Sequence, residues 1–310
     1  MRLKLIKFVS KIITIILKFV KKINSKKSNF FGHKLNELKN RLIAKKLKSE
    51  HGLLISKYSN FTNNYDDAVK LTNVWVCWFQ GQDNAPYIVQ RCIDSIRSSV
   101  RGLDVIIITD ENFSLYTNLP EHIISKYKRG IITKTHFSDI LRAELLSTNG
   151  GIWLDATLLC LKPLPEEFFK SSFFTLKSNT VQDFITISNG KWAGYCMSSN
   201  RNNKLLSFLR DFLFEYWMFH DGMIDYFLID YIIKIAYDSF DDVRNEIDIM
   251  PAYGDNRHML DSLLSKEFNE KDNEKITNDK IKIYKLSYKK NYIITIDPTR
   301  KRTFYDYYLK

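Results

Sequence analysis

Residues 135–159 read THFSDILRAELLSTNGGIWLDATLL, and this stretch decides the fold. Apolar residues over 136–148 have the spacing of a helix, and the apolar run over 151–160 is typical of a buried strand. Gly150 suits the positive-φ position that follows many helices, and Gly151 lets the backbone turn into the strand. A helix that leads directly into a buried strand is the repeating pattern of an α/β fold.

The same alternation precedes this stretch. Buried strands are predicted over 73–81 and 103–112, Pro86 opens a helix, and a second helix is predicted over 119–130. Strands that alternate with helices predict an α/β fold with a mostly parallel sheet flanked by helices. Ligands of such sheets bind beyond the carboxyl ends of the strands. The first candidates for a site are therefore the polar residues at those ends, namely Trp78, Gln80, Asp110, Asp155 and Thr157.

The later part of the chain gives less regular patterns. Strands are predicted over 173–178 and 184–199, and helices with dense aromatic faces over 204–220 and 223–237. Residues 265–280 are charged and poor in apolar residues, so we predict a surface loop there. Residues 281–297 alternate between apolar and polar side chains, so we predict a hairpin.

Composition argues against two classes of protein. The net charge is +12, but residues 1–50 hold fifteen Lys and Arg against two Glu, which leaves 32 basic and 33 acidic residues in 51–310. A nucleic-acid-binding protein spreads its basic groups over its folded face, so the neutral body argues against that class. The four cysteines are scattered without a Cys-x-x-Cys pair, so they suggest neither a zinc site nor a disulfide framework.

The basic charge belongs to an amphipathic N-terminal segment. On a helix, Lys4, Lys7, Lys11, Lys18 and Lys22 share one sector, and the apolar side opposite is formed by Leu5, Val9, Ile12, Ile13, Ile16 and Val20. Uncharged stretches between the lysines are too short to span a bilayer. We expect residues 1–25 to lie on an anionic membrane surface. The alternative is a helix docked on this protein's own core or on a partner subunit.

Two domains are predicted from these patterns. Residues 26–59 continue as a Lys-rich helical stretch, and the polar run SNFTNNYDD over 59–67 reads as a linker. We therefore predict a membrane-associating helical segment over 1–60 and an α/β domain over 68–310.

Four side chains of the opening stretch could converge on one cleft. Asp139 and Arg142 lie three residues apart and share a helix face. Asp155 and Thr157 lie two apart and would point to the same side of a strand. Such a set suits a ribose, a metal-bound diphosphate and a sugar hydroxyl. The alternative is a helical ion pair beside a carboxylate that caps a loop.

The block FSDILRAELLSTNGGIWLDATL resembles the signature of the capsular polysaccharide synthesis protein family, which is related to glycosyltransferases with a DXD-containing sugar-binding region. The resemblance extends over roughly 70–300. It includes WFQG-x-x-NAP (78–86), LPEHIISKYKRG-x-I-x-x-THFSDILR (119–142), FLRDFLFEYW (208–217), IDYFLIDY (224–231) and KLSYK (285–289).

The resemblance implies a GT-A fold, a nucleotide-sugar donor with UDP-sugar as the expected kind, a divalent metal (Mn²⁺ or Mg²⁺), and retention at the anomeric carbon. By position, Trp78 would flank the base. Gln80 and Asp110, chosen for their places at strand ends, are expected to bind the same donor. Asp139 would hold ribose or sugar hydroxyls, and Arg142 the sugar or phosphate. Asp155, as the first Asp of DXD, would contact the metal and the ribose.

One departure from the family pattern concerns the metal. Thr157 stands where DXD has its second Asp, and a hydroxyl is a much weaker ligand than a carboxylate. Water, Asp110 or His258 could complete a shell around Asp155 and Thr157. Alternatively, Lys285 and Lys289 could neutralise the diphosphate without metal. Cations on the leaving diphosphate stabilise the transition state in either case.

These patterns together predict a glycosyltransferase of capsular or cell-surface polysaccharide synthesis, peripheral on the cytoplasmic face of the bacterial inner membrane. Its acceptor would be a glycan or a lipid-linked sugar, and nucleic acid is not an expected partner. Asp155, Arg142 and Asp230 are the predicted catalytic residues, with Asp230 or its neighbour Asp225 reaching the acceptor. The rival interpretation is a scaffold that keeps the fold and has lost catalysis.

Overall fold

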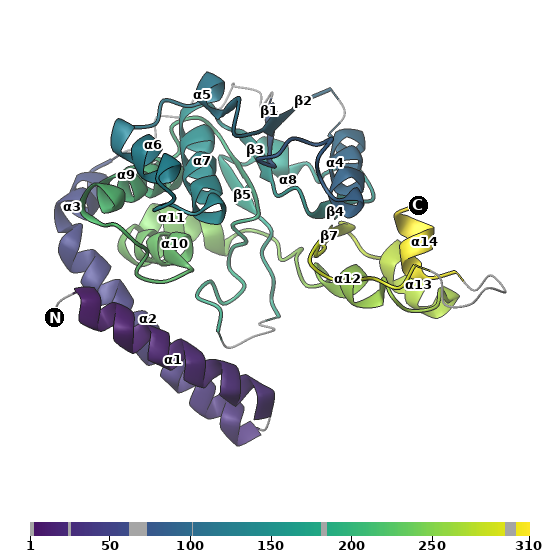
Figure 1. Ribbon diagram of the computed structural model, residues 1–310, viewed down its shortest axis with the longest axis horizontal. Coiled ribbons are helices and arrows are strands. Elements are labelled where there is room, and N and C mark those ends of the chain that lie inside the picture. Colours follow the sequence, from purple (N-terminus) through teal and green to yellow (C-terminus); the bar gives the residue numbers. More distant parts are fainter. Residues whose placement is uncertain (1–2, 24–25, 62–72, 101, 181–184, 295–301) are drawn as a thin grey trace.

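The computed structural model describes residues 3–23, 26–61, 73–100, 102–180, 185–294 and 302–310. Its centre is a five-stranded sheet in the order β2-β1-β3-β6-β5 (Figure 1). The strands are β1 (Asn73–Cys77), β2 (Asp104–Ile108), β3 (Gly151–Leu154), β5 (Phe173–Thr175) and β6 (Cys196–Ser199). β1 pairs in parallel with β2 and β3, while β6 is antiparallel to both β3 and β5. Four of the five strands therefore run in one direction, which confirms the predicted mostly parallel α/β sheet.

Helices cover the sheet and fill the core. They are α4 (Tyr87–Ser99), α5 (Phe113–Tyr116), α6 (Glu121–Lys128), α7 (Lys134–Thr148), α8 (Glu167–Lys170), α9 (Lys204–Phe219), α10 (Leu228–Ser239) and α11 (Asp241–Asp248). α7 packs between the sheet and α9, so side chains on both of its faces, such as Ile140, Leu141 and Leu145, are fully buried. Its start is fixed by Thr133, whose side chain accepts a hydrogen bond from the backbone N–H of His136.

A small second sheet lies beside the central one. β4 (Leu158–Cys160) pairs antiparallel with β7 (Ile283–Lys285), and Leu158 stands opposite Lys285. α12 (Met259–Leu263), α13 (Glu270–Thr277) and α14 (Phe304–Tyr308) complete this C-terminal part (Figure 1). The pairing brings Lys285 next to the turn that follows β3.

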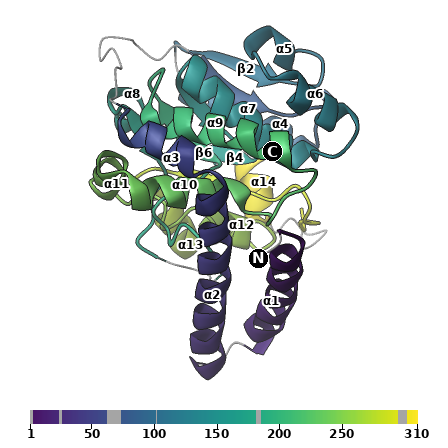
Figure 2. The ribbon, with the colours of Figure 1, turned by 90° about the vertical axis from the view of Figure 1, so that its left-hand side faces the viewer.

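Three helices precede the α/β body. α1 (Leu3–Ile23) and α2 (Lys26–Glu50) form an antiparallel hairpin that projects from the body, and α3 (Gly52–Ser59) packs against α9 (Figures 1 and 2). Asp225 holds the hairpin, because it accepts hydrogen bonds from Ser10 Oγ at 3.0 Å and from the buried Lys39 Nζ at 3.2 Å. Among the described residues, no helix is both long enough and apolar enough to cross a membrane.

The apolar residues of α1 occupy two faces rather than the single predicted side. Ile6, Ile13, Leu17 and Val20 are buried, whereas the exposed ones are Leu5, Phe8, Ile12, Ile15, Ile16, Phe19 and Ile23. One face packs within the protein, as the docked-helix alternative expects, and the other faces solvent.

Several predicted elements differ from the structure near the site. The strand over 151–160 is broken at Asp155, because the Leu158 N–H donates to the Asp155 carbonyl and closes a turn. The strand predicted over 184–199 is limited to β6, and 181–184 lie outside the described residues. The helix predicted from 223 begins at Leu228, because Asp225 Oδ1 accepts from the Phe227 N–H and holds a turn there.

Two C-terminal expectations were also wrong. The segment 265–280 contains helix α13, which Asn269 caps by accepting from the Asp272 N–H. Only Asn273 and Ile276 of this helix are buried, so its apolar pattern was too sparse to recognise. The hairpin predicted over 281–297 is absent from its described part, 281–294, where the single strand β7 pairs with β4.

The glycine pair behaves as the sequence predicts. Gly150 has φ +68° and Gly151 has φ +108°, both in the region that disfavours side chains. A Cβ added to Gly151 would lie 2.5 Å from the Asn73 carbonyl oxygen and 2.9 Å from Trp75 Nε1. Gly151 therefore allows β3 to approach β1 closely.

We predict that Gly151→Ala lowers the free energy of unfolding by about 3 kcal/mol, from backbone strain plus this contact. Gly130 is the matched control, because it has φ +72° and open space around its Cβ position. Gly130→Ala should cost about 1 kcal/mol in urea denaturation. Equal losses in the two variants would show that the approach of β3 to β1 imposes no constraint.

Candidate active site

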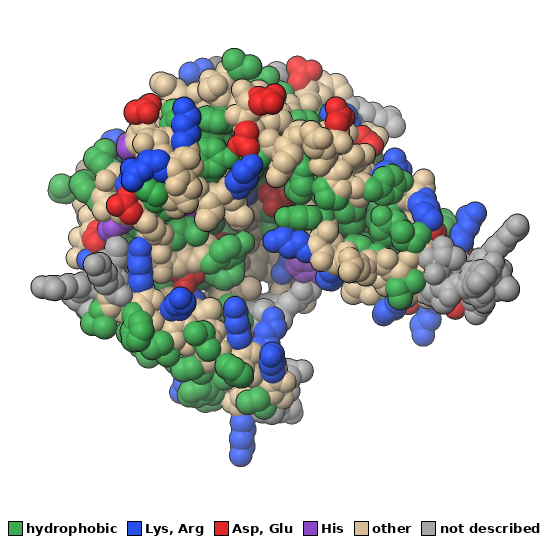
Figure 3. Space-filling model, viewed as in Figure 1, with side chains coloured by type: hydrophobic (Ala, Val, Ile, Leu, Met, Phe, Trp, Pro, Cys, Tyr) green, Lys and Arg blue, Asp and Glu red, His purple; other side chains and the backbone are tan. Residues whose placement is uncertain are grey.

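A cleft of about 510 Å³ lies at the carboxyl ends of β1 and β3. Figure 3 shows the surface hollowed between the body and the part that carries β7 and α12. The walls come from the residues after β1, the start of α7, the turn after β3 and the loop after β7. The lining residues used below are Trp78, Gln80, Lys134, Ser138, Trp153, Asp155, Thr157, Tyr226, Lys285, Tyr288 and Lys289.

Asp155 is the centre of the charge network at this cleft. Its Oδ2 accepts from Lys285 Nζ at 2.6 Å. Its Oδ1 accepts from Arg142 Nη2 at 3.2 Å and from Trp153 Nε1 at 2.9 Å. Burial raises the pKa of Asp155, but the positive charges of Lys285 and Arg142 lower it further, so the net pKa lies below the ordinary value. The carboxylate is therefore charged at neutral pH.

Arg142 lies behind the cleft rather than in it. It is 4% exposed, donates from Nη1 to Asp139 Oδ1 at 2.8 Å, and packs over the Trp153 ring. The guanidinium thus bridges Asp139 and Asp155, which agrees with the prediction that these side chains lie close together. Both of its hydrogen bonds go to carboxylates of the protein rather than toward a ligand. Neither Arg142 nor Asp139 lines the cleft.

His136 supports this network from below. Its Nε2 accepts from Trp217 Nε1 at 2.9 Å, so the proton of the neutral ring is on Nδ1, which lies 3.4 Å from Asp139 Oδ2. His136 is 2% exposed, its Nδ1 makes no hydrogen bond among the described residues, and it does not line the cleft.

Trp78 presents an unused donor at the cleft. Its indole Nε1 is buried and has no hydrogen-bond partner among the described residues, and its ring meets the edge of Tyr288 at 5.1 Å between centroids. Buried donors without a partner are rare in proteins, so this one suits a ligand acceptor atom. Gln80, Thr157 and Lys289 also line the cleft, so these sequence-predicted residues are brought together with Asp155.

Three predicted residues lie elsewhere. Asp110 is held by Lys134 Nζ at 2.6 Å and by Tyr127 Oη, and it does not line the cleft. Asp230 and His258 line a second pocket. Lys134 was missed by sequence reasoning, although its place at the start of α7, one turn before Ser138, could have indicated it.

The cleft as built does not fit a divalent cation. Both oxygens of Asp155 are engaged by cationic or indole donors, Thr157 offers a hydroxyl, and Asp155 is the only carboxylate among the described lining residues. In the described part of the chain, the one cluster of three His, Cys, Asp or Glu side chains that could share a metal is Glu50, His51 and His220. Asp110 and His258, each expected as a possible further ligand beside Asp155 and Thr157, do not line this cleft, so the described residues form no complete shell around Asp155.

A second pocket of about 240 Å³ adjoins the cleft. Gly194 and Tyr195 line it from the side of the charge network: Lys285 Nζ lies 4.9 Å from the Tyr195 ring centroid, and a Cβ on Gly194 would lie 3.3 Å from Arg142 Nη1. The Tyr195 hydroxyl is buried without a partner among the described residues. Arg257 also lines this pocket. Tyr195 and Arg257 carry no motif that the sequence could have revealed.

Asp230 is the carboxylate of this second pocket. It accepts from Trp192 Nε1 at 2.9 Å. Burial, helped by the nearby Asp139 charge, raises the pKa of Asp230 to about 6. The Asp230 side chain can thus change its charge near physiological pH.

The structure is that of an α/β protein with a cleft at the carboxyl ends of its strands that three lysines and one aspartate line. Residues 21–308 match the family described as capsular polysaccharide synthesis protein, and the chain belongs to that family. This confirms the resemblance drawn from the 136–157 block. A solved structure, the PaToxG glycosyltransferase, is 13% identical with a TM-score of 0.39, over 68% of this chain and 83% of that chain. No curated protein matches the chain significantly.

The raised pKa of Asp230 predicts a pH-dependent stability difference. The folded state binds a proton more tightly than the unfolded state, so stability from this group is full below about pH 4 and is lost as the pH rises towards 6. Asp230→Asn removes the titration and keeps an acceptor for Trp192. The variant should match the wild type at pH 4 and exceed it by about 3 kcal/mol above pH 7 in urea denaturation. A constant difference across this range would contradict the shifted pKa.

Proposed function

We propose that this chain is a glycosyltransferase that moves a sugar from a nucleotide-sugar donor, a UDP-sugar in the first instance, to a glycan or lipid-linked acceptor during capsular or cell-surface polysaccharide synthesis. The observation that carries the proposal is the cleft lined by Lys134, Lys285 and Lys289, in which Lys285 pairs with Asp155 and the indole N–H of Trp78 has no partner among the described residues. Membership of the capsular polysaccharide synthesis protein family supports the same substrate class.

In this proposal the donor lies along the cleft, with its base at Trp78 and Tyr288 and its diphosphate at the lysines. Charge builds up on the diphosphate as the glycosidic bond breaks, and ammonium groups already in place stabilise it. Asp155 and Arg142 are then positioning residues: Asp155 orients Lys285, and Arg142 fixes Asp155 from behind. The lysines take the role that the resemblance gives to a divalent metal.

The acceptor occupies the second pocket, across the layer formed by Tyr195 and Gly194. The unpartnered Tyr195 hydroxyl and the Asp230 carboxyl would bind its hydroxyl groups. Asp155, the one carboxylate among the described lining residues, is engaged by three donors and is not free to act as a nucleophile in a double displacement. Retention, which the family resemblance implies, would then proceed by front-face attack of the acceptor. The anomeric configuration of the product, read by NMR, tests this: inversion would instead assign Asp230 as the base.

We predict that UDP raises the melting temperature of the protein equally in EDTA and in Mn²⁺, because binding to the folded state stabilises it and the lysines suffice for the diphosphate. Lys285→Ala should weaken UDP binding about tenfold or more, in line with a lost charge-assisted contact. Lys280→Ala is the control, since Lys280 contacts Tyr253 and does not line the cleft.

The outcomes separate the rival functions. A shift that requires Mn²⁺ would mean that Asp155 releases Lys285 to bind metal. The absence of a shift with any nucleotide or nucleotide sugar, together with no donor hydrolysis or transfer, would favour the non-catalytic scaffold.

We further propose that the exposed apolar stripe of α1 rests on an anionic leaflet. The stripe repeats every three or four residues and is formed by Leu5, Phe8, Ile12, Ile15, Ile16, Phe19 and Ile23. Exposed lysines at 11, 18 and 22 flank it, and Figure 3 shows apolar and basic side chains together over the N-terminal hairpin. Burying the stripe removes apolar area from water, and each lysine adds about 1 kcal/mol near anionic lipid. This surface would bring the enzyme to a lipid-linked acceptor.

Sedimentation with vesicles that contain phosphatidylglycerol tests the stripe. Phe8→Ser combined with Phe19→Ser should reduce binding at least about tenfold, since each phenylalanine contributes on the order of 1.5–3 kcal/mol when buried. Leu115→Ser is the control, because Leu115 is even more exposed than Phe8 and Phe19 but lies on α5. Unchanged vesicle binding in the double variant would show that the stripe does not bind the membrane. Dimers of the wild type that the double variant loses would show that the stripe contacts a second copy of the chain.

A further inference from the structure

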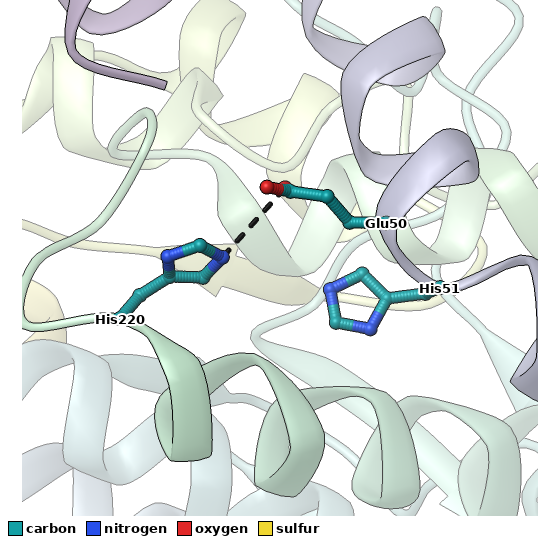
Figure 4. Close-up of side chains that lie close together, drawn as sticks. All are labelled: Glu50, His51 and His220. Atoms are coloured by element: carbon teal, nitrogen blue, oxygen red, sulfur yellow. Dashed lines mark ion pairs between the residues drawn. The ribbon is translucent and has the colours of Figure 1, made fainter. Parts of the chain in front are cut away.

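Three potential ligands meet where the N-terminal helices join the body. Glu50 ends α2, His51 precedes α3, and His220 follows α9. One ligand atom of each lies within 4.8 Å of the others, and His220 Nε2 is 3.6 Å from Glu50 Oε2. Figure 4 shows the side chains of the adjacent Glu50 and His51 pointing toward His220, which comes from a distant segment.

His51 has the protonation pattern of a metal ligand. Its ring is 1% exposed, and its Nδ1 lies 2.9 Å from Glu215 Oε1. A carboxylate only accepts, so Nδ1 carries the proton and Nε2 carries a free lone pair. Nε2 is buried, has no hydrogen-bond partner among the described residues, and faces His220 and Glu50 in Figure 4. A buried acceptor without a partner costs stability unless something fills that role.

We propose that Glu50, His51 and His220 bind Zn²⁺, with Glu215 as the carboxylate that orients His51. Two imidazoles and one carboxylate form a known zinc ligand set that leaves a position for water. Ligands about 2.1 Å from a tetrahedral zinc stand roughly 3.4 Å apart, so the side chains need to close by less than about 1.5 Å. A metal-bound histidine that donates its other N–H to a carboxylate is the usual arrangement around zinc.

The surroundings of the site are compatible with a cation. Burial lowers the pKa of both His51 and His220, so both rings are neutral and able to coordinate near neutral pH. Lys46 Nζ pairs with Glu50 Oε1 at 2.8 Å, which leaves Oε2 on the side of His220. The charges of Lys7 and Lys46 disfavour a further positive charge at His220, whereas the charge of Glu50 favours one.

This zinc lies apart from the proposed donor and acceptor sites. None of its ligands lines the cleft or the second pocket. It joins the end of α2 to the end of α9, segments about 170 positions apart in the sequence, and so fixes the N-terminal helices on the body. Rigid ring contacts prepare the site: His51 packs on Phe212 at 4.0 Å and His220 on Tyr216 at 4.4 Å between centroids.

Cobalt(II) replacing zinc in the full chain tests the proposal, because its visible absorption reports coordination number. We expect a single equivalent of Co²⁺ with the intense spectrum of a four- or five-coordinate site, displaced by Zn²⁺. His220→Gln and Glu50→Gln should abolish this spectrum, and Glu215→Gln should weaken Zn²⁺ affinity about ten- to a hundredfold. His122→Asn is the control, since His122 contacts the Phe214 carbonyl away from the cluster.

Folding of each variant is checked by circular dichroism and by urea denaturation in EDTA, where the metal makes no contribution. A weak octahedral spectrum in the wild type, or an intense one that persists in His220→Gln and Glu50→Gln, would overturn the proposal. Loss of the spectrum in His122→Asn as well would also count against it, because it would show that the signal does not come from this cluster.

Discussion

The ion pairs of Asp155 are the interaction on which the site depends. One carboxylate holds Arg142 from α7 and Lys285 from β7, and it sits in the turn that separates β3 from β4. The Asp155 carboxylate therefore links the central sheet, the small sheet and helix α7. Removing either cation from such a partly buried group leaves a charge uncompensated, which costs more than the intact pair contributes. Arg142 is the more constrained partner, because Asp139 and the Trp153 ring hold it on other sides.

Local pattern accounts for the part of the site that could be predicted. The helix that became α7, the positive-φ glycines and the buried strand after them all depend on neighbours within a few residues. Asp155 could be recognised because a carboxylate at the end of an apolar strand has no structural need there. Trp78 and Gln80 followed from the rule that ligands bind beyond strand ends.

Long-range pairing accounts for the part that could not be predicted. The antiparallel β4–β7 pair brings Lys285 to Asp155, 130 positions away in the sequence. Both strands have only three residues, too few to show a periodic pattern. The expected alternation of Asp155 and Thr157 along one strand failed, yet both still line the cleft, because the turn directs them there. Asp110 was assigned to the site by its strand-end position. Its carboxylate instead accepts hydrogen bonds from Lys134 and Tyr127 and does not line the cleft.

The buried Lys39 has a consequence for how the chain can be divided. Its ammonium group and the Ser10 hydroxyl both rest on Asp225, and Tyr231 donates to Asn40 from the same region of the body at 2.6 Å. Asp225 also sets the turn that leads into α10 and therefore the placement of Asp230. Proteolytic removal of the N-terminal hairpin would thus leave a stranded negative charge five residues from the second pocket's own carboxylate. The hairpin therefore contributes to the folded structure around the second pocket, and cutting it away should disturb that pocket.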